Sequence, residues 1–109
     1  PRDCPRKIAG ALSIIRRNYA KPISLQSVAD ELSVSTGYLS RLFLSTVGCT
    51  FTDMLNQTRV DRAKQLLNGG EIPVYRAGEL VGIANATYFI RVFRKYTGVT
   101  PNEYRGKPV

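Results

Sequence analysis

Residues 85–98 read NATYFIRVFRKYTG, and at about 100° per residue this segment separates into two helical faces. One face is apolar and aromatic, with Phe89, Val92, Phe93 and Tyr96. The opposite face carries Thr87, Arg91 and Arg94, with Ile90 and Lys95 at its margins. The segment therefore predicts a helix that packs one face into a core and presents the other to a polyanion.

The same pattern occurs fifty positions earlier in the chain. Residues 37–43 read GYLSRLF and align with TYFIRVF at 87–93, and GCTF at 48–51 aligns with GVTP at 98–101. A repeat of this period indicates one supersecondary unit that is used twice. We therefore expect two related subdomains within the 109 residues.

The composition favours nucleic acid as a partner, with an acidic membrane second and a merely soluble basic surface as the alternative. Sixteen Lys and Arg against eight Asp and Glu give a net charge of +8. The chain contains no histidine, the commonest general base and metal ligand, so we predict no enzyme, no metal and no cofactor. The two separated cysteines, Cys4 and Cys49, favour a reducing, cytoplasmic compartment. No apolar run approaches the length of a membrane span, and a start at Pro1 suggests a fragment of a longer chain.

Periodicity and capping residues predict an all-α fold with about seven helices. The expected helix starts lie at Lys7, Leu25, Thr36, Phe51, Pro73, within 85–98, and at Pro101. The second and third helices surround a turn of about three residues, which is typical of a helix-turn-helix, although an ordinary helical hairpin remains an alternative. We predict a linker remnant at 1–6, a first helix-turn-helix subdomain at 7–49, a long linking helix at 50–68, a second subdomain at 69–105 and a tail at 106–109.

Taken together, the repeat and the linking helix resemble the signature of AraC/XylS-type transcription regulators. The resemblance covers residues 7–105 and rests on Arg59-Val60, Ala63, Leu66-Leu67, Val81-Gly82, Tyr88-Phe89, residues 91–95, residues 98–101 and Tyr104-Arg105. In that family, two helix-turn-helix lobes joined by one long helix place two recognition helices in neighbouring major grooves of DNA. The resemblance implies the output domain of a bacterial transcription factor, with RNA polymerase as a partner and an N-terminal sensory or receiver domain outside this sequence.

Residues that would contact DNA are carried over from the family by position. Base-reading residues would be Thr36, Gly37, Ser40 and Arg41 in the first lobe and Ala86, Thr87, Ile90 and Arg91 in the second. Arginine can bridge two acceptors of guanine, although each arginine can instead serve phosphate or pair with an acid. Backbone contacts would come from helix N-termini near Ser24, Ser35, Pro73 and Asn85, and from Arg94 and Lys95.

Several positions depart from the family pattern or allow two interpretations. Ala77 and Gly78 are smaller than usual, so we expect their helix to be less well packed and less stable. Leu44 and Ser45 stand where basic residues are common, and Leu44 either packs against the linking helix or is exposed. Ile90 either meets a thymine methyl group, as Thr87 would, or is a half-buried packing residue. We expect Arg59 and Arg62 to be structural rather than phosphate contacts.

The two lobes are expected to divide the work on DNA. If both engage one face of B-DNA, their recognition helices lie about 34 Å apart, over an operator of about twenty base pairs without palindromy. We hypothesise that the first lobe reads the base sequence and that the more basic second lobe mainly binds the DNA backbone. Two alternatives remain: a protein-interaction module that docks on RNA polymerase or a partner domain through Leu44 or Ile90, and an enzyme that uses Cys49, which has no histidine to activate it.

Overall fold

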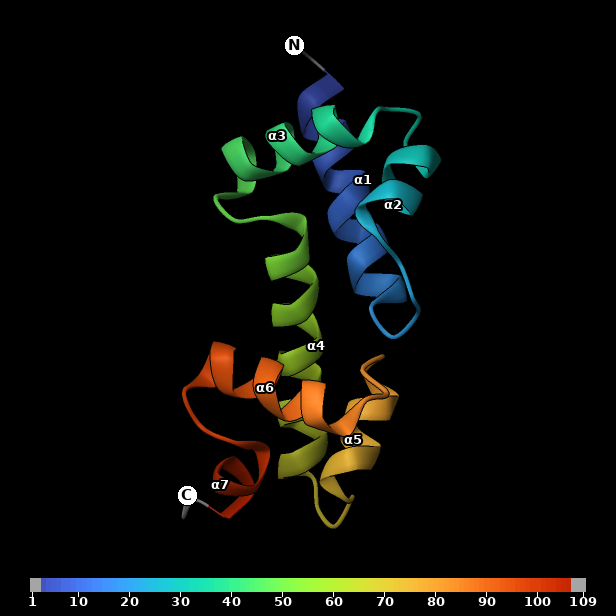
Figure 1. Ribbon diagram of the computed structural model, residues 1–109. Helices are drawn as coiled ribbons and strands as arrows, with labels where there is room; N and C mark the ends of the chain where they lie inside the picture. The colour runs from blue at the N-terminus through green and yellow to red at the C-terminus, as the bar shows by residue number, and fades with distance from the viewer. Residues whose placement is uncertain (1–2, 107–109) are drawn as a thin grey trace. The chain divides into compact units, whose positions relative to one another are not determined.

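The computed structural model describes residues 3–106, and over this range it contains helices and no strand (Figure 1). The seven helices of this range are α1 Asp3–Asn18, α2 Leu25–Glu31, α3 Thr36–Val47, α4 Phe51–Asn68, α5 Val74–Leu80, α6 Ala86–Thr97 and α7 Pro101–Gly106. The predicted all-α fold is therefore confirmed, with helix starts close to those expected from the sequence.

Two helix starts differ from the sequence prediction, and both involve proline. Helix α1 begins at Asp3, four residues before the predicted Lys7, so most of the expected linker 1–6 is helical. The first four N–H groups of a helix have no intrahelical partner, so Pro5 can sit in the first turn without loss of a hydrogen bond. Pro73 is the N-cap of α5 rather than its first helical residue, because its ψ of 149° is extended. Residues 1, 2 and 107–109, which include most of the predicted tail, lie outside the described residues.

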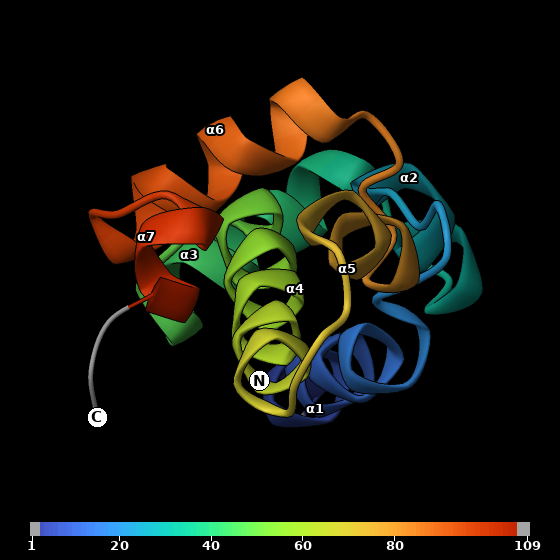
Figure 2. The same ribbon diagram turned by 90° about the horizontal axis from the view of Figure 1, so that it is seen from below.

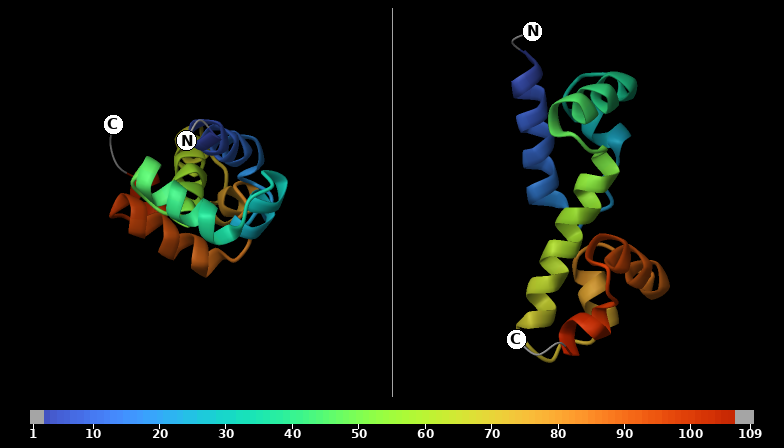
Figure 3. Two further views of the ribbon diagram at one scale, coloured as in Figure 1. Left: turned by 90° about the horizontal axis from the view of Figure 1, so that it is seen from above. Right: turned by 90° about the vertical axis from the view of Figure 1, so that its left-hand side faces the viewer.

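The chain forms two compact units, residues 1–55 and 56–109, and the division falls inside α4. In the first unit, α1 and the α2–α3 pair surround one apolar core (Figure 3). Its buried residues are Ile8, Ala11, Ile14, Ile15, Val28, Ala29, Leu39, Phe43, Phe51 and Leu55. Phe43 and Phe51 meet edge to face with ring centroids 5.9 Å apart, which joins α3 to the start of α4.

In the second unit, α5, α6 and α7 pack around the C-terminal part of α4 (Figure 2). The buried apolar residues are Val60, Ala63, Leu67, Ala77, Gly78, Val81, Ile83, Phe89, Val92, Phe93 and Pro101. Phe93 stands at the centre, with its ring centroid 5.9 Å from that of Phe89 and 5.6 Å from that of Tyr104. These contacts fix the rotation of α6 about its own axis, and so determine which side chains of α6 face outward.

The expectation that α5 is less well packed is wrong at Gly78, because Gly78 has no room for a larger side chain, whereas the lower stability expected of α5 stays a prediction. A Cβ added to Gly78 would lie 2.8 Å from Cγ of Phe89 and 2.9 Å from the carbonyl oxygen of Ile83. The Phe89 ring and the carbonyl oxygen of Ile83 therefore occupy the space that a side chain at Gly78 would need. The small residue on α5 reflects the large one on α6.

None of the helices within residues 3–106 is both long enough and apolar enough to cross a membrane.

Candidate nucleic-acid interface

Helix α3 presents one polar face because the opposite face is anchored in the core of the first unit. The backbone N–H of Tyr38 donates to Oγ of the N-cap Ser35 at 3.1 Å, which fixes the start of the helix. Leu39 and Phe43 are fully buried. The residues predicted to read bases therefore point outward or lie at the edge: Gly37, Ser40 and Arg41 are exposed, and Thr36 is half-buried.

Helix α6 repeats this construction in the second unit. The N–H of Tyr88 donates to Oδ1 of the N-cap Asn85 at 2.8 Å, and Phe89, Val92 and Phe93 are buried. All the residues predicted to touch DNA from this helix are exposed, namely Ala86, Thr87, Ile90, Arg91, Arg94 and Lys95. The helical spacing thus brings the predicted residues of the second unit together on one surface.

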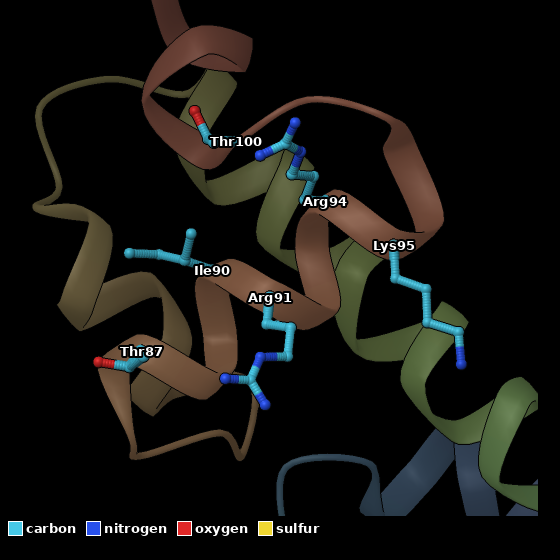
Figure 4. A pocket seen from close by; sticks show the side chains of 6 residues that line it. All are labelled: Thr87, Ile90, Arg91, Arg94, Lys95 and Thr100. Atoms are coloured by element: carbon cyan, nitrogen blue, oxygen red, sulfur yellow. The ribbon is translucent and has the colours of Figure 1, made fainter.

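The outer face of α6 borders a shallow, open concavity of about 470 Å³ (Figure 4). Its lining consists of Thr87, Ile90, Arg91, Arg94, Lys95 and Thr100. Thr100 belongs to the start of α7 and was not among the predicted site residues. Its sequence signal was the capping box that begins α7, in which the N–H of Glu103 donates to Oγ1 of Thr100 at 3.2 Å and the N–H of Thr100 donates to Oε1 of Glu103 at 2.9 Å.

The guanidinium groups on the two recognition helices have no acidic partner in the described part of the chain. Among the side chains that the structure describes, which are those of residues 6–106, the guanidinium groups of Arg41, Arg91 and Arg94 take part in no hydrogen bond or ion pair. Nη1 of Arg41 lies 3.3 Å from the position that a Cβ on Gly37 would take, so the absent side chain at Gly37 leaves room for the guanidinium. These cations are therefore available to an external anion.

The structure gives the exposure of two side chains whose roles the sequence left open. Leu44 is 53% exposed, so the interpretation that it packs against the linking helix is wrong. Ile90 is 38% exposed and lines the concavity, and its role as a thymine contact or as a half-buried packing residue stays a prediction. An aliphatic side chain therefore lies on the outer face of each recognition helix.

The residues predicted at helix N-termini are all N-caps, but one of them, Pro73, forms no side-chain hydrogen bond with its helix. Ser24 and Ser27 form a reciprocal capping box at α2, in which the N–H of Ser27 donates to Oγ of Ser24 at 3.1 Å and the N–H of Ser24 donates to Oγ of Ser27 at 2.9 Å. Ser35 and Asn85 cap α3 and α6, whereas Pro73 has no side chain that can cap α5. Their contacts with a DNA backbone remain a prediction.

Arg59, on α4, lies half-buried in the second unit. Burial lowers the pKa of its guanidinium below the usual value, and the nearby Tyr88 partly offsets this effect by favouring the charged form. Arg59 also has an interaction within the chain. These features agree with the structural role that the sequence suggested for this arginine.

Comparison with known proteins identifies the family. A family profile described as a helix-turn-helix domain matches residues 28–107. A transcriptional regulator from Chromobacterium violaceum, described by its AraC-type DNA-binding domain, superposes with a TM-score of 0.85 at 26% identity over 100% of both chains. This chain belongs to the AraC-type helix-turn-helix family. The helix-turn-helix domain of this family serves transcription regulation, and one matched relative, AdaA of Bacillus subtilis (strain 168), is described as a bifunctional transcriptional activator and DNA repair enzyme.

Other AraC-type proteins support the assignment and show how much of a regulator this chain represents. The C-terminal domain of AraT, a response regulator from Geobacillus stearothermophilus, has a TM-score of 0.88 at 35% identity and covers 91% of this chain and 83% of that one. The HTH-type transcriptional regulator YijO of Escherichia coli (strain K12) is 40% identical over 91 residues, which is 84% of this chain and 32% of YijO. The chain thus spans about a third of the length of the curated relatives it matches.

Proposed function

We propose that this chain is the DNA-binding output domain of a larger bacterial transcription regulator in the cytoplasm, and that it recognises a specific double-stranded sequence. The observation that carries the proposal is the outer face of α6. There, Arg91, Arg94 and Lys95 lie on one exposed surface with no acidic side chain among the residues that line it. Such a cationic face on the second helix of a helix-turn-helix is suited to the major groove and its flanking phosphates.

The two recognition helices are suited to different parts of this task. Helix α3 offers Ser40 and Arg41, which can exchange hydrogen bonds with base edges, and no other cation on its outer face. Helix α6 adds Arg94 and Lys95 to Arg91, which favours attraction to phosphate over discrimination between bases. The first unit therefore mainly selects sequence, and the second mainly supplies affinity.

The rest of the proposal concerns the whole regulator. With one recognition helix in each of two adjacent major grooves, the operator spans about twenty base pairs and is not palindromic, because the two helices differ. A sensory or receiver domain N-terminal to this chain would control access to the operator, and RNA polymerase would be the partner at the promoter. We propose no catalytic role for the chain.

Selection from a random 30-base-pair duplex library, followed by binding measurements over a salt series, tests this function. We expect an enriched sequence of about twenty base pairs, and an affinity that falls steeply and linearly in log–log form as salt rises. A chain that enriches no sequence and binds with no salt dependence would contradict the proposal.

A second candidate is a protein-interaction module, and the 53% exposure of Leu44 on α3 favours it. Leu44 occupies the place of Arg94 in the repeat, so it is an apolar group where the other helix has a cation. The same salt series separates the two candidates, because docking on RNA polymerase or on a partner domain would proceed without duplex DNA.

A further inference from the structure

We propose that Ile90, with Thr87 beside it, makes α6 a reader of thymine methyl groups, so that the second unit selects T·A pairs by apolar contact. The inference rests on the proposed function. It specifies how α6, the helix proposed to bind mainly phosphate, also selects a base sequence. It assigns a base preference to a unit that otherwise presents mainly phosphate-binding cations.

The geometry places an aliphatic group at the edge of a cationic surface. Ile90 is 38% exposed and lies one helical turn after Thr87 and one turn before Arg94 on the outer face of α6. All three line the same concavity, together with Arg91 and Lys95 (Figure 4). A duplex held by the cations would therefore lie beside Ile90.

The chemistry of the major groove then limits what Ile90 can favourably meet. The attraction of three cations to phosphate brings this face close to the base edges and removes water from Ile90. An isoleucine side chain offers no donor or acceptor, so it leaves a polar base edge without a hydrogen bond when it covers one. The C5-methyl of thymine is the one apolar group that a standard base presents in the major groove.

The first unit differs at the equivalent position. Ser40 takes the place of Ile90 in the repeat, and it is exposed on α3. A hydroxyl can donate to or accept from several base edges and has no preference for a methyl group. Methyl reading is therefore expected from α6 and not from this position of α3.

The test uses the duplex enriched by the selection, with each thymine replaced singly by deoxyuridine, which removes the methyl group and keeps the base pair. For the unaltered chain we expect a loss of about fourfold in affinity at one or two positions, the size of one lost apolar methyl contact. In Ile90→Ala this penalty should vanish at the same positions, and in Ile90→Val it should persist.

Leu80→Ala is the matched control, because Leu80 is 40% exposed in the same unit but lies on α5. It should keep the full penalty at every position. A penalty that is absent from the unaltered chain, or that Ile90→Ala retains unchanged, would overturn the inference while leaving specific DNA binding intact. If no sequence is enriched in the first place, the proposed function fails and the inference fails with it.

Discussion

The two helix-turn-helix units share one backbone plan but differ in both core and surface. Helices α3 and α6 have 12 residues each, begin at a side-chain N-cap and end at a glycine in the left-handed region, with φ of 92° at Gly48 and 84° at Gly98. In each turn, a backbone N–H returns to a carbonyl of the preceding helix, from Val34 to Ala29 at 3.0 Å and from Ile83 to Gly78 at 2.8 Å. The two units therefore share a backbone conformation, whereas many of their aligned side chains differ.

In the core, the two units differ in the sizes of the side chains at two aligned positions, one on each helix of the helix-turn-helix. The first unit has Ala29 on α2 and Leu39 on α3, whereas the second has Gly78 on α5 and Phe89 on α6 at the aligned positions. The second unit therefore has the smaller residue on its first helix and the larger residue on its recognition helix. This exchange shows that the small residue of each first helix has to be judged with its partner and not by helix propensity alone.

On the surface, the difference lies in the second half of each recognition helix. Leu44 and Ser45 of α3 align with Arg94 and Lys95 of α6, and all four are exposed. The change alters the charge of the face without altering the helix that carries it. Two copies of one structural unit can in this way divide recognition and affinity between them.

Gly78→Ala should produce the largest effect on stability. Alanine is the better helix former, but its Cβ would lie 2.8 Å from the Phe89 ring, so we expect a loss of about 2 kcal/mol in the free energy of unfolding. Thermal and urea unfolding of the purified chain measure this loss. An equal or higher stability would mean that the volume exchange between the two cores is not real.

Phe89→Leu in the Gly78→Ala background tests the same exchange in the opposite direction. The double variant carries the alanine and leucine of the first unit, so it should be more stable than Gly78→Ala alone. If Phe89→Leu destabilises the chain equally in both backgrounds, the two positions are independent and this account of α5 is wrong.

Exchanging the exposed residues in the second halves of α3 and α6 should change how much each unit contributes to the affinity for DNA. Arg94→Leu with Lys95→Ser removes two cations from α6, and we expect the salt slope on a scrambled duplex to fall by about 2 and the affinity at 0.1 M salt by roughly tenfold. Leu44→Arg with Ser45→Lys should raise the slope by a similar amount. Fluorescence anisotropy over a salt series measures both, and an unchanged slope in either variant would count against a phosphate-gripping role for these positions.

The two turns offer a smaller and local test. Ser33 has a φ of 61°, which is uncommon for a residue with a Cβ, and its counterpart in the second turn is Gly82 with a φ of 96°. Ser33→Gly should therefore stabilise the chain by about 0.5–1 kcal/mol, and Gly82→Ser should destabilise it by about 1 kcal/mol. Chemical unfolding decides, and a stabilising effect of Gly82→Ser would refute the assigned backbone conformation.

Features that depend on local sequence were largely predictable. The N-caps Ser24, Ser35 and Asn85, the C-cap glycines and the capping box of α7 follow from side chains that bond to backbone groups within three residues. The second turn is one residue longer than the first, because residues 81–85 separate α5 from α6 and residues 32–35 separate α2 from α3. The outward orientation of Arg41 and Arg91 could also be expected from helical spacing alone.

Features that depend on packing across elements were not predictable from one sequence. The space at Gly78 is set by the carbonyl oxygen of Ile83 and by the Phe89 ring, which lies eleven positions along the chain on another helix. Whether Leu44 is covered depends on which atoms surround it in three dimensions, and periodicity gives only its helical face. The helical start at Asp3 was missed because Pro5 suggests a break, although it is tolerated in a first turn.

We propose above that the first unit reads sequence and the second mainly binds the phosphate backbone. Arg41→Ala and Arg94→Ala, each measured on the selected duplex and on a scrambled one, test it most directly. We expect Arg41→Ala to lower the affinity ratio of the two duplexes by about tenfold or more, and Arg94→Ala to weaken both duplexes similarly and leave the ratio unchanged. An equal loss on both duplexes for Arg41→Ala, or a collapsed ratio for Arg94→Ala, would contradict the division of roles.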